Sequence, residues 1–384
     1  MPAGTRLKGA TLKLETYVFW GNINIHVYPL ALALSSFKNI FIIIDSNSLT
    51  NRVERRQEYK NLKNLTIIDF SKNGNLNSII NGFNIRETIH INTSLKKQNY
   101  YTSKALKFLL KKKCIVFSLP QEGFQFQGWK GLLNRFKWYI YINFYYKNIK
   151  GYGLTGDNAF NDFKSIGCNK NKCFPCLYAT NPPISTQPPT TNKIFTIIFV
   201  GAIDKRKNIK TIIKWLIHNK ENIKTEYKFH IFGGYGDVQD LNNLIENNPN
   251  FFYHGIVPNK QIQEAMCQSD LLILPSLYDG WGAVINEALQ CGCKVLVSNR
   301  CGSECLIRNR EFLGNVFDVL DESDFINKFI YLLQKGKLTD KDRKEIIEWS
   351  NLHISPEVIA NYLNQIFEYY CNNKKTLLPI APWI

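Results

Sequence analysis

The sequence has 384 residues, which suggests two domains at roughly 150 residues per domain. Apolar residues make up 45% of the chain and aromatic residues 13%, a composition that excludes a wholly disordered protein. The formal net charge is +17, and all of it lies in residues 1–180, which hold 26 Lys and Arg against 9 Asp and Glu; residues 181–384 hold 22 of each. The first half is therefore expected to meet an anionic partner, such as nucleic acid, a membrane surface or a phosphorylated acceptor, unless the charge only serves solubility.

Short apolar runs in the first half alternate with amphipathic stretches, which is typical of strands alternating with helices. The expected strands are 17–20, 40–44, 65–68, 88–91 and 114–118. The expected helices are 27–35, 100–110 and 129–145.

A linker is predicted at 181–193, because its four prolines sustain neither a helix nor a central strand. The charge balance changes at the same place. Strands are then expected at 194–200, 227–232, 251–254, 271–274 and 294–298. Helices are expected at 208–218, from 237 onward, at 261–267, 283–290 and 356–370.

Repeated βαβ units predict a parallel, doubly wound sheet in each half. The expected fold class is therefore α/β, with two Rossmann-like domains that face each other across a cleft. We predict domains at 1–180 and 194–352, the linker at 181–193, and a C-terminal helix and tail at 353–384. Ligands are expected at the carboxyl ends of the strands.

No transmembrane helix or secretory signal is expected. The most apolar stretch, residues 27–45, is interrupted by Pro29 and Lys38. We therefore expect a cytoplasmic protein whose ten cysteines are reduced thiols. The spacing of the cluster at 168–176 matches a zinc site only weakly, and no metal is predicted.

The segment PSLYDGWGAVINEALQCG, residues 275–292, follows an expected strand and opens an expected helix. Gly280 and Gly282 let the backbone approach a ligand and present amides to an anion. Asp279 and Glu287, eight residues apart, would face one crevice and hold sugar or ribose hydroxyls. The alternative is a capping aspartate and a solvated glutamate.

A second strand-to-helix junction is FVGAIDKRKN, residues 199–208. Lys205, Arg206 and Lys207 are adjacent cations at the carboxyl end of a strand. They can neutralise a diphosphate there, or they form an ordinary basic loop.

Together these segments resemble the C-terminal, nucleotide-binding domain of a GT-B glycosyltransferase, in particular of retaining family 4. That family joins a strand ending in Pro-Ser to a Glu-x7-Glu motif with an internal Gly-(Phe/Trp)-Gly, which residues 275–292 match. Residues 199–208 resemble its strand followed by Gly-Arg-Leu-x3-Lys-Gly, and FFYHGIV at 251–257 and LLILP at 271–275 resemble two further strands. The four motifs stand in the family's order over about residues 194–352.

By this resemblance Lys207 contacts the donor diphosphate, Glu287 binds the nucleotide ribose and Asp279 contacts the transferred sugar. The other donor contacts that the family implies are Gly201, Ile256, Val257, Gly280, Trp281 and Gly282. Asp279 is one methylene shorter than the family's glutamate, and Ala202 stands where many members have an arginine. Arg206 is expected to compensate, from a position that the family does not use.

The first half offers two candidates that face the acceptor in a GT-B enzyme. His90 is expected at a strand end, where some family members place a histidine near the scissile bond; a core or surface histidine is the alternative. Glu122 also follows a strand and is nearly the only acid between residues 88 and 156. Residues 104–150 interleave Lys and Arg with aromatic residues, which suits an anionic membrane interface, although half of the aromatics at helical spacing are expected in the core.

The resemblance implies a metal-independent, retaining hexosyltransferase with a nucleotide-diphosphate sugar as donor and no cofactor. A glycan or lipid-linked acceptor is expected, in cell-surface polysaccharide or lipopolysaccharide synthesis on the cytoplasmic face of a membrane, with no nucleic-acid partner. A non-enzymatic basic protein that binds nucleic acid or membrane is the alternative. It would tolerate alanine at Asp279 and Glu287, whereas the enzyme would not.

Overall fold

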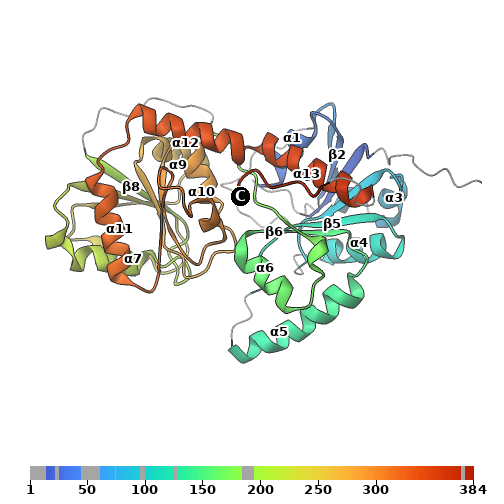
Figure 1. Cartoon of the computed structure of the whole chain (residues 1–384), viewed down its shortest axis with the longest axis horizontal. Helices are drawn as coiled ribbons and strands as arrows, with labels where there is room; N and C mark the ends of the chain where they lie inside the picture. The colour runs from blue at the N-terminus through green and yellow to red at the C-terminus, as the bar shows by residue number, and fades with distance from the viewer. Residues whose placement is uncertain are drawn as a thin grey trace, which may run out of the picture.

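The computed structural model describes residues 14–21, 26–44, 61–73, 75–95, 100–124, 128–183, 194–372 and 377–384. They form two α/β domains side by side, each built on one sheet, with a pair of long helices running across both (Figure 1). Within these residues no helix combines the length and hydropathy needed to cross a membrane.

The first domain has a seven-stranded parallel sheet in the order β3-β2-β1-β4-β5-β6-β7. Its strands are β1 Thr16–Trp20, β2 Asn39–Ile44, β3 Leu65–Asp69, β4 Thr88–Asn92, β5 Ile115–Gln121, β6 Gly151–Leu154 and β7 Cys173–Pro175. Its helices are α1 Val27–Leu34, α2 Phe70–Asn73, α3 Leu76–Asn81, α4 Tyr100–Lys111, α5 Gly128–Ile140 and α6 Gly156–Ser165, with a π-helical turn η3 at Tyr141–Tyr145 and a 3-10 turn η4 at Lys170–Lys172. The central strands are buried on both faces, as expected of a parallel sheet covered by helices.

The second domain has a six-stranded parallel sheet in the order β10-β9-β8-β11-β12-β13. Its strands are β8 Phe195–Val200, β9 Tyr227–Phe232, β10 Phe251–Gly255, β11 Leu271–Leu274, β12 Lys294–Ser298 and β13 Gly314–Phe317. The accompanying helices and 3-10 turns are α7 Ile209–His218, η5 Lys220–Asn222, α8 Val238–Ile245, α9 Asn259–Gln268, α10 Val284–Gln290, η6 Gly302–Leu306, α11 Glu322–Gln334 and α12 Asp340–His353. The prediction of two parallel sheets in an α/β fold is therefore confirmed.

The last helix, α13 Pro356–Cys371, crosses back from the second domain to the first (Figure 1). Phe367 packs edge-on against Tyr17 of β1 with ring centroids 5.3 Å apart. The Tyr17 hydroxyl donates a hydrogen bond to Asn364, and the Tyr362 hydroxyl donates one to the Pro175 carbonyl in β7. The expected crossover of the C-terminal helix is confirmed.

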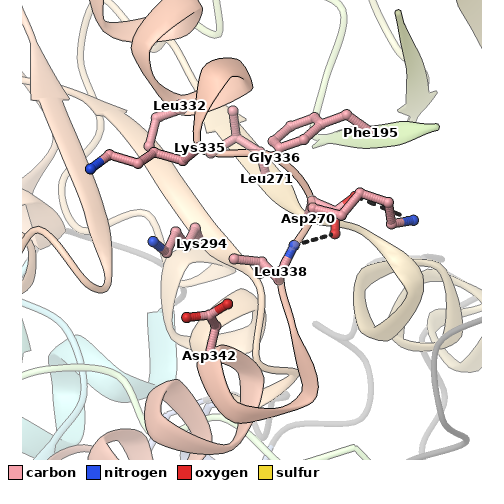
Figure 2. A pocket seen from close by; sticks show the side chains of 10 residues that line it. Phe195, Asp270, Leu271, Lys294, Leu332, Lys335, Gly336, Leu338 and Asp342 are labelled. Atoms are coloured by element: carbon pink, nitrogen blue, oxygen red, sulfur yellow. Dashed lines mark hydrogen bonds and ion pairs between the residues drawn. The ribbon is translucent and has the colours of Figure 1, made fainter. Parts of the chain in front are cut away.

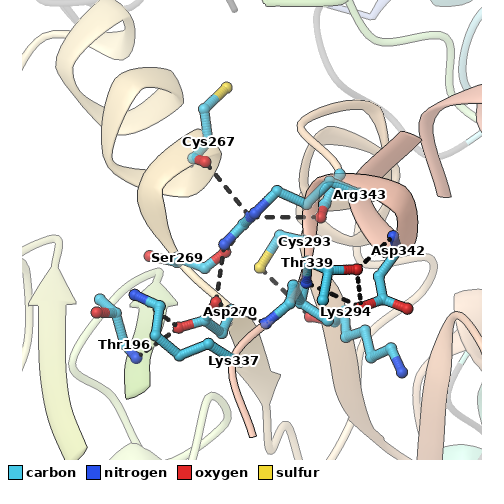
Figure 3. A network of polar contacts seen from close by, with 12 residues as sticks. Thr196, Cys267, Ser269, Asp270, Cys293, Lys294, Lys337, Thr339, Asp342 and Arg343 are labelled. Carbon is cyan, nitrogen blue, oxygen red and sulfur yellow. Dashed lines mark hydrogen bonds and ion pairs between the residues drawn. The ribbon is translucent and has the colours of Figure 1, made fainter. Parts of the chain in front are cut away.

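A buried ion pair organises the amino ends of the second sheet (Figure 3). Asp270, fully buried before β11, receives a 2.8 Å hydrogen bond from the Arg343 guanidinium of α12 and a 2.9 Å bond from the Thr196 amide. Lys337 lies 3.6 Å away from the same carboxylate. A cavity of about 150 Å³ opens beside it, and Figure 2 shows Lys294 and Asp342 on its wall. This cavity is at the opposite edge of the sheet from the one where α/β sheets bind ligands.

Several elements differ from the sequence-based expectation. Strands β6, β7 and β13 and helices α2, α3, α6, α11 and α12 were not predicted. The single helix expected at 129–145 is α5 followed by the π-helical turn. Residues 184–193 of the predicted linker lie outside the described residues. The ten cysteines are free thiols.

Candidate functional site

The two donor motifs meet at the carboxyl ends of neighbouring strands. Lys207 follows β8 and Asp279 follows β11, and the Lys207 Nζ lies 2.6 Å from the Asp279 Oδ2. Both side chains are mostly buried, with 13% and 12% of their surface exposed. The Arg206 guanidinium lies 3.5 Å from the same oxygen and donates to the Tyr278 carbonyl. One carboxylate is thus shared by two cations, an arrangement that can bind an anion once a cation exchanges partners.

Backbone geometry fixes the loop that carries Asp279. Its amide donates to the Arg300 carbonyl, and its carbonyl accepts from the Gly302 amide, so the loop is tied to the strand end beside it. Gly282 has a φ of +88°, a conformation that glycine adopts without strain. A side chain there would also press on Leu274 and Ser303. The loop is therefore held rigidly where the helix α10 begins.

Glu122 brings a carboxylate of the first domain to this loop. It follows β5, and a Cβ added to Gly280 would overlap its carboxyl group. A side chain at position 280 would therefore displace the Glu122 carboxylate from this loop. The Thr155 hydroxyl adds a weak 3.4 Å bond to the Gly280 carbonyl, and the Tyr278 hydroxyl bonds the Gly123 carbonyl at 3.2 Å. The carboxyl ends of β5 and β6 thus meet the carboxyl end of β11.

A chain of hydrogen bonds joins Glu122 to the predicted glycine-tryptophan-glycine loop. The Trp281 indole donates to Asn286 Oδ1 at 3.0 Å, and Asn286 Nδ2 donates to the Tyr178 carbonyl at 3.0 Å. The Tyr178 hydroxyl donates to Glu122 Oε1 at 2.9 Å. Burial, and then the Glu122 charge, raise the pKa of Tyr178 well above its usual value, so the hydroxyl stays protonated.

Sequence reasoning missed Tyr178, Asn286 and Tyr278 as members of this site. Asn286 and Tyr278 lie inside the motif segment 275–292, so the motif could have indicated both as site residues. Tyr178 precedes the proline-rich stretch and carries no motif, and only the fold brings it to Glu122.

The remaining predicted donor residues lie along the same edge of the second sheet. Gly201 follows β8, and Gly233 lies so close to its carbonyl that a side chain at position 233 would overlap it. Ile256 and Val257 follow β10, with Ile256 exposed and Val257 half-buried. Glu287 lies in the first turn of α10 and is half-buried. Its predicted role at the ribose stays a prediction.

His90 is not at a strand end, as expected, but in the middle of β4. Its side chain is buried, and its Nδ1 accepts a 3.0 Å hydrogen bond from the Trp20 indole. Burial lowers the pKa of His90 to about 3, so the imidazole is neutral near pH 7. These are the properties of the core histidine that the sequence left open as the alternative.

Within the described part of the chain, no three His, Cys, Asp or Glu side chains come together as a metal-ion site. The cysteine cluster supplies one close pair, Cys168 and Cys173, whose sulfurs are 3.7 Å apart, while Cys176 is buried. The absence of a metal requirement stays a prediction.

Residues 183–349 match the model of the family described as Glycosyl transferases group 1. This segment contains β8 to β13 and the Lys207–Asp279 pair. The resemblance of the second half to this class of enzyme is therefore confirmed.

Curated relatives match only parts of the chain. An uncharacterised 41.2 kDa protein in the cps region of Klebsiella pneumoniae is 33% identical over 103 residues, 27% of this chain and 27% of that protein. The UDP-Gal:alpha-D-GlcNAc-diphosphoundecaprenol alpha-1,3-galactosyltransferase of Escherichia coli is 29% identical over 141 residues, 35% of this chain and 36% of that protein. The matched part of the chain thus spans only about a quarter to a third of these relatives.

Solved structures resemble nearly the whole chain. The apo form of the lipopolysaccharide outer core galactosyltransferase WaaB superposes with a TM-score of 0.62 at 13% identity, covering 94% of this chain and 99% of that one. Anabaena HepE in complex with UDP superposes with a TM-score of 0.65 at 10% identity, covering 91% and 98%. Such identities establish the fold alone, and the predicted GT-B architecture is confirmed.

Proposed function

We propose that this protein is a retaining glycosyltransferase of family 4 that moves a hexose from a nucleotide-diphosphate sugar to a glycan or lipid-linked acceptor. The observation that carries the proposal is the Lys207–Asp279 pair, which lies in the segment matched by the glycosyltransferase family model. Glu122 of the first domain faces the loop that carries Asp279. The relatives named for galactosyl transfer support a role in cell-surface polysaccharide or lipopolysaccharide synthesis.

The donor is proposed to bind along the carboxyl edge of the second sheet. Lys207 leaves Asp279 to pair with the diphosphate, and Arg206 adds a second cation beside it. Asp279, released, accepts hydrogen bonds from hydroxyls of the transferred sugar. Glu287 would hold the ribose, and the backbone at Ile256 and Val257 would meet the base. The UDP complex of the structural neighbour supports a nucleoside diphosphate as the ligand class.

The chemical step then follows from where charge develops. The bond from the sugar C1 to the diphosphate oxygen breaks, and negative charge grows on that oxygen. Lys207 and Arg206 stabilise this charge, which is the main electrostatic demand of the reaction. The acceptor hydroxyl forms the new bond to C1 on the same face, and its proton passes to the leaving diphosphate. No step requires a metal or a cofactor.

The acceptor is proposed to enter from the first domain. Glu122 faces Gly280 and can accept a hydrogen bond from an acceptor hydroxyl, which fixes the acceptor beside the donor sugar. We route no proton transfer through His90, because its buried imidazole already accepts the Trp20 indole proton and has a strongly lowered pKa. The excess positive charge of residues 1–180 supports a peripheral position on the cytoplasmic face of a membrane.

The test is a transfer assay with UDP-, GDP- and ADP-hexoses and a polyprenyl-diphosphate-linked sugar as acceptor. The expected result is a glycosylated acceptor whose new linkage keeps the donor's anomeric configuration, as read by NMR, with activity lost in Asp279→Ala. An inverted linkage would contradict retention. Sugar release that is equally fast with and without acceptor would instead identify a hydrolase.

A further inference from the structure

Helix α5 turns its apolar side chains away from the protein. Trp129, Leu132, Leu133 and Phe136 follow the spacing i, i+3, i+4, i+7 of a single helical face. All four are exposed, Trp129 to 70% and Phe136 to 67%. A surface helix normally turns such a stripe toward its core, so this stripe lacks the usual partner within the described residues.

The opposite side of α5 is the one that packs. At 3.6 residues per turn, Gly131 and Trp138 lie about 180° around the helix from Trp129. Gly131 is buried, and Trp138 stacks on Phe124 with ring centroids 4.4 Å apart. Figure 1 shows α5 along the outer edge of the first domain, beyond α6. The helix is therefore anchored by its back, with its apolar stripe facing outward.

Cations flank the stripe on both sides. Lys130 and Lys137 lie about 90° from Trp129 on one flank, and Arg135 lies about 120° away on the other. All three are exposed. Residues 104–150 contain ten Lys and Arg and a single acid, Glu122, which belongs to the site. An apolar stripe with a basic rim and no acids is the pattern of a helix that lies in a membrane interface.

The stripe continues into η3 and a groove beside it. Phe144 and Tyr145 of η3 are exposed, by 61% and 67%. Between η3 and α4 lies a groove of about 470 Å³, lined by Lys107, Lys111 and the rings of Tyr141, Tyr145 and Tyr146. Exposed lysines beside phenol groups suit the phosphate of a lipid headgroup, because ammonium and hydroxyl donors can both reach its oxygens.

We propose that this α5 face, made of Trp129, Leu132, Leu133, Phe136, Phe144 and Tyr145, docks on an anionic lipid bilayer. The apolar stripe enters the interface between headgroups and acyl chains, and the flanking cations pair with lipid phosphates. A protein partner would need an acidic rim around an apolar groove to match this face. An anionic bilayer provides negative headgroups and apolar acyl chains at every point of its surface. This surface deepens the proposed function, since it names how the enzyme reaches a lipid-linked acceptor.

The test is co-sedimentation of the full chain with vesicles of phosphatidylcholine alone or mixed with phosphatidylglycerol. Each cation near an anionic surface strengthens binding roughly fivefold, so the mixed vesicles should bind at least tenfold more tightly, with the difference lost at high salt. The variant Trp129→Ser/Phe136→Ser should weaken binding to mixed vesicles at least tenfold. The matched control Leu320→Ser/Leu352→Ser, which removes two equally exposed side chains of the second domain, should bind like the unmodified protein.

Titration with a nucleoside diphosphate separates this proposal from the proposed function. Unchanged nucleotide affinity in Trp129→Ser/Phe136→Ser shows that the variant is folded. Full vesicle binding by that variant, or no vesicle binding by the unmodified protein, overturns the docking surface while leaving the transferase proposal intact. A change of oligomeric state in the variant, without vesicle binding by either form, assigns the stripe to a protein partner and also overturns it.

Discussion

Lys207 Nζ lies 2.6 Å from Asp279 Oδ2, although 72 residues separate the two in sequence. They stand at the carboxyl ends of β8 and β11, which are neighbours in the second sheet. Both side chains are nearly buried, so neither charge is well solvated. The Asp279 carboxylate therefore stabilises the Lys207 charge, and a diphosphate would have to replace that carboxylate as its partner.

Replacing Asp279 by Asn is expected to lower kcat about 100-fold, because a neutral amide holds the sugar hydroxyls less strongly in the transition state. Donor affinity should change little, because the weaker hydrogen bonds to the sugar are offset by a Lys207 that no longer has to leave a charged partner. Steady-state kinetics with varied donor concentration measure both quantities. The control is Asp237→Asn, which neutralises the exposed partner of Lys210 and should leave kcat unchanged. Equal rates in the two variants would remove Asp279 from the site.

The Tyr178 hydroxyl holds Glu122 at 2.9 Å, so Tyr178→Phe should let the carboxylate move. We expect the KM for the acceptor to rise several-fold and the KM for the donor to stay the same. Glu122→Gln should have a similar effect, and the double variant should add little, because the two residues act as one unit. Tyr331→Phe, which removes a tyrosine hydrogen bond to Glu311 on the surface, is the control. Additive effects of the two substitutions would argue against a positioning role for Tyr178.

The buried Asp270–Arg343 pair is expected to be structural. Asp270→Ala leaves the Arg343 guanidinium buried without its carboxylate, which should cost about 3–5 kcal/mol of unfolding free energy. Lys337→Ala removes a cation that is 25% exposed and lies farther from Asp270, at 3.6 Å, so it should cost less, about 1 kcal/mol. Urea denaturation of both variants measures the difference. Similar losses of unfolding free energy in the two variants would show that the buried ion pair stabilises the fold no more than the contact with Lys337.

The buried His90 makes stability depend on pH. Its pKa is about 3 in the folded protein and 6.5 in a model peptide, so the unfolded chain binds the extra proton between these values. The contribution of His90 to the free energy of unfolding is complete above about pH 6.5. It is lost as the pH falls toward 3, by about 1.4 kcal/mol per pH unit. Denaturation curves of His90→Gln should lack this part of the slope, whereas His218→Gln, which changes an exposed histidine, should keep it.

The sequence predicted those strands and helices that a local pattern of apolar and polar residues defines. The β9 strand, Tyr227–Phe232, and the β12 strand, Lys294–Ser298, have the predicted bounds, because each is an apolar run closed by polar or glycine residues. The short strand β7, Cys173–Pro175, ends in proline and was missed. Periodicity predicted the helix at 129–145 but not its orientation, and half of its aromatics were expected inside. The structure leaves Trp129 and Phe136 outside, because which side of a helix packs depends on tertiary contacts.

The candidate site likewise contains residues that local motifs predict and residues that only the fold brings together. Lys207 and Asp279 could be predicted because they lie in motifs at strand ends, where a parallel sheet brings them together. Their direct ion pair could not, since it depends on side-chain conformation. Tyr178 lies on the connection between the domains, and its approach to Glu122 follows from how the two sheets face each other.

Titration calorimetry with UDP, GDP and ADP measures whether Lys207 binds a donor diphosphate. At least one of the three should bind to the unmodified protein. Lys207→Ala should weaken that binding by about 10–100-fold, since it removes a charge-assisted contact worth about 1.5–3 kcal/mol. Lys214→Ala, which removes an exposed cation of α7 outside the basic loop, should bind as tightly as the unmodified protein. Binding of none of the three nucleotides, or equal affinity in Lys207→Ala and Lys214→Ala, would show that Lys207 does not hold a diphosphate.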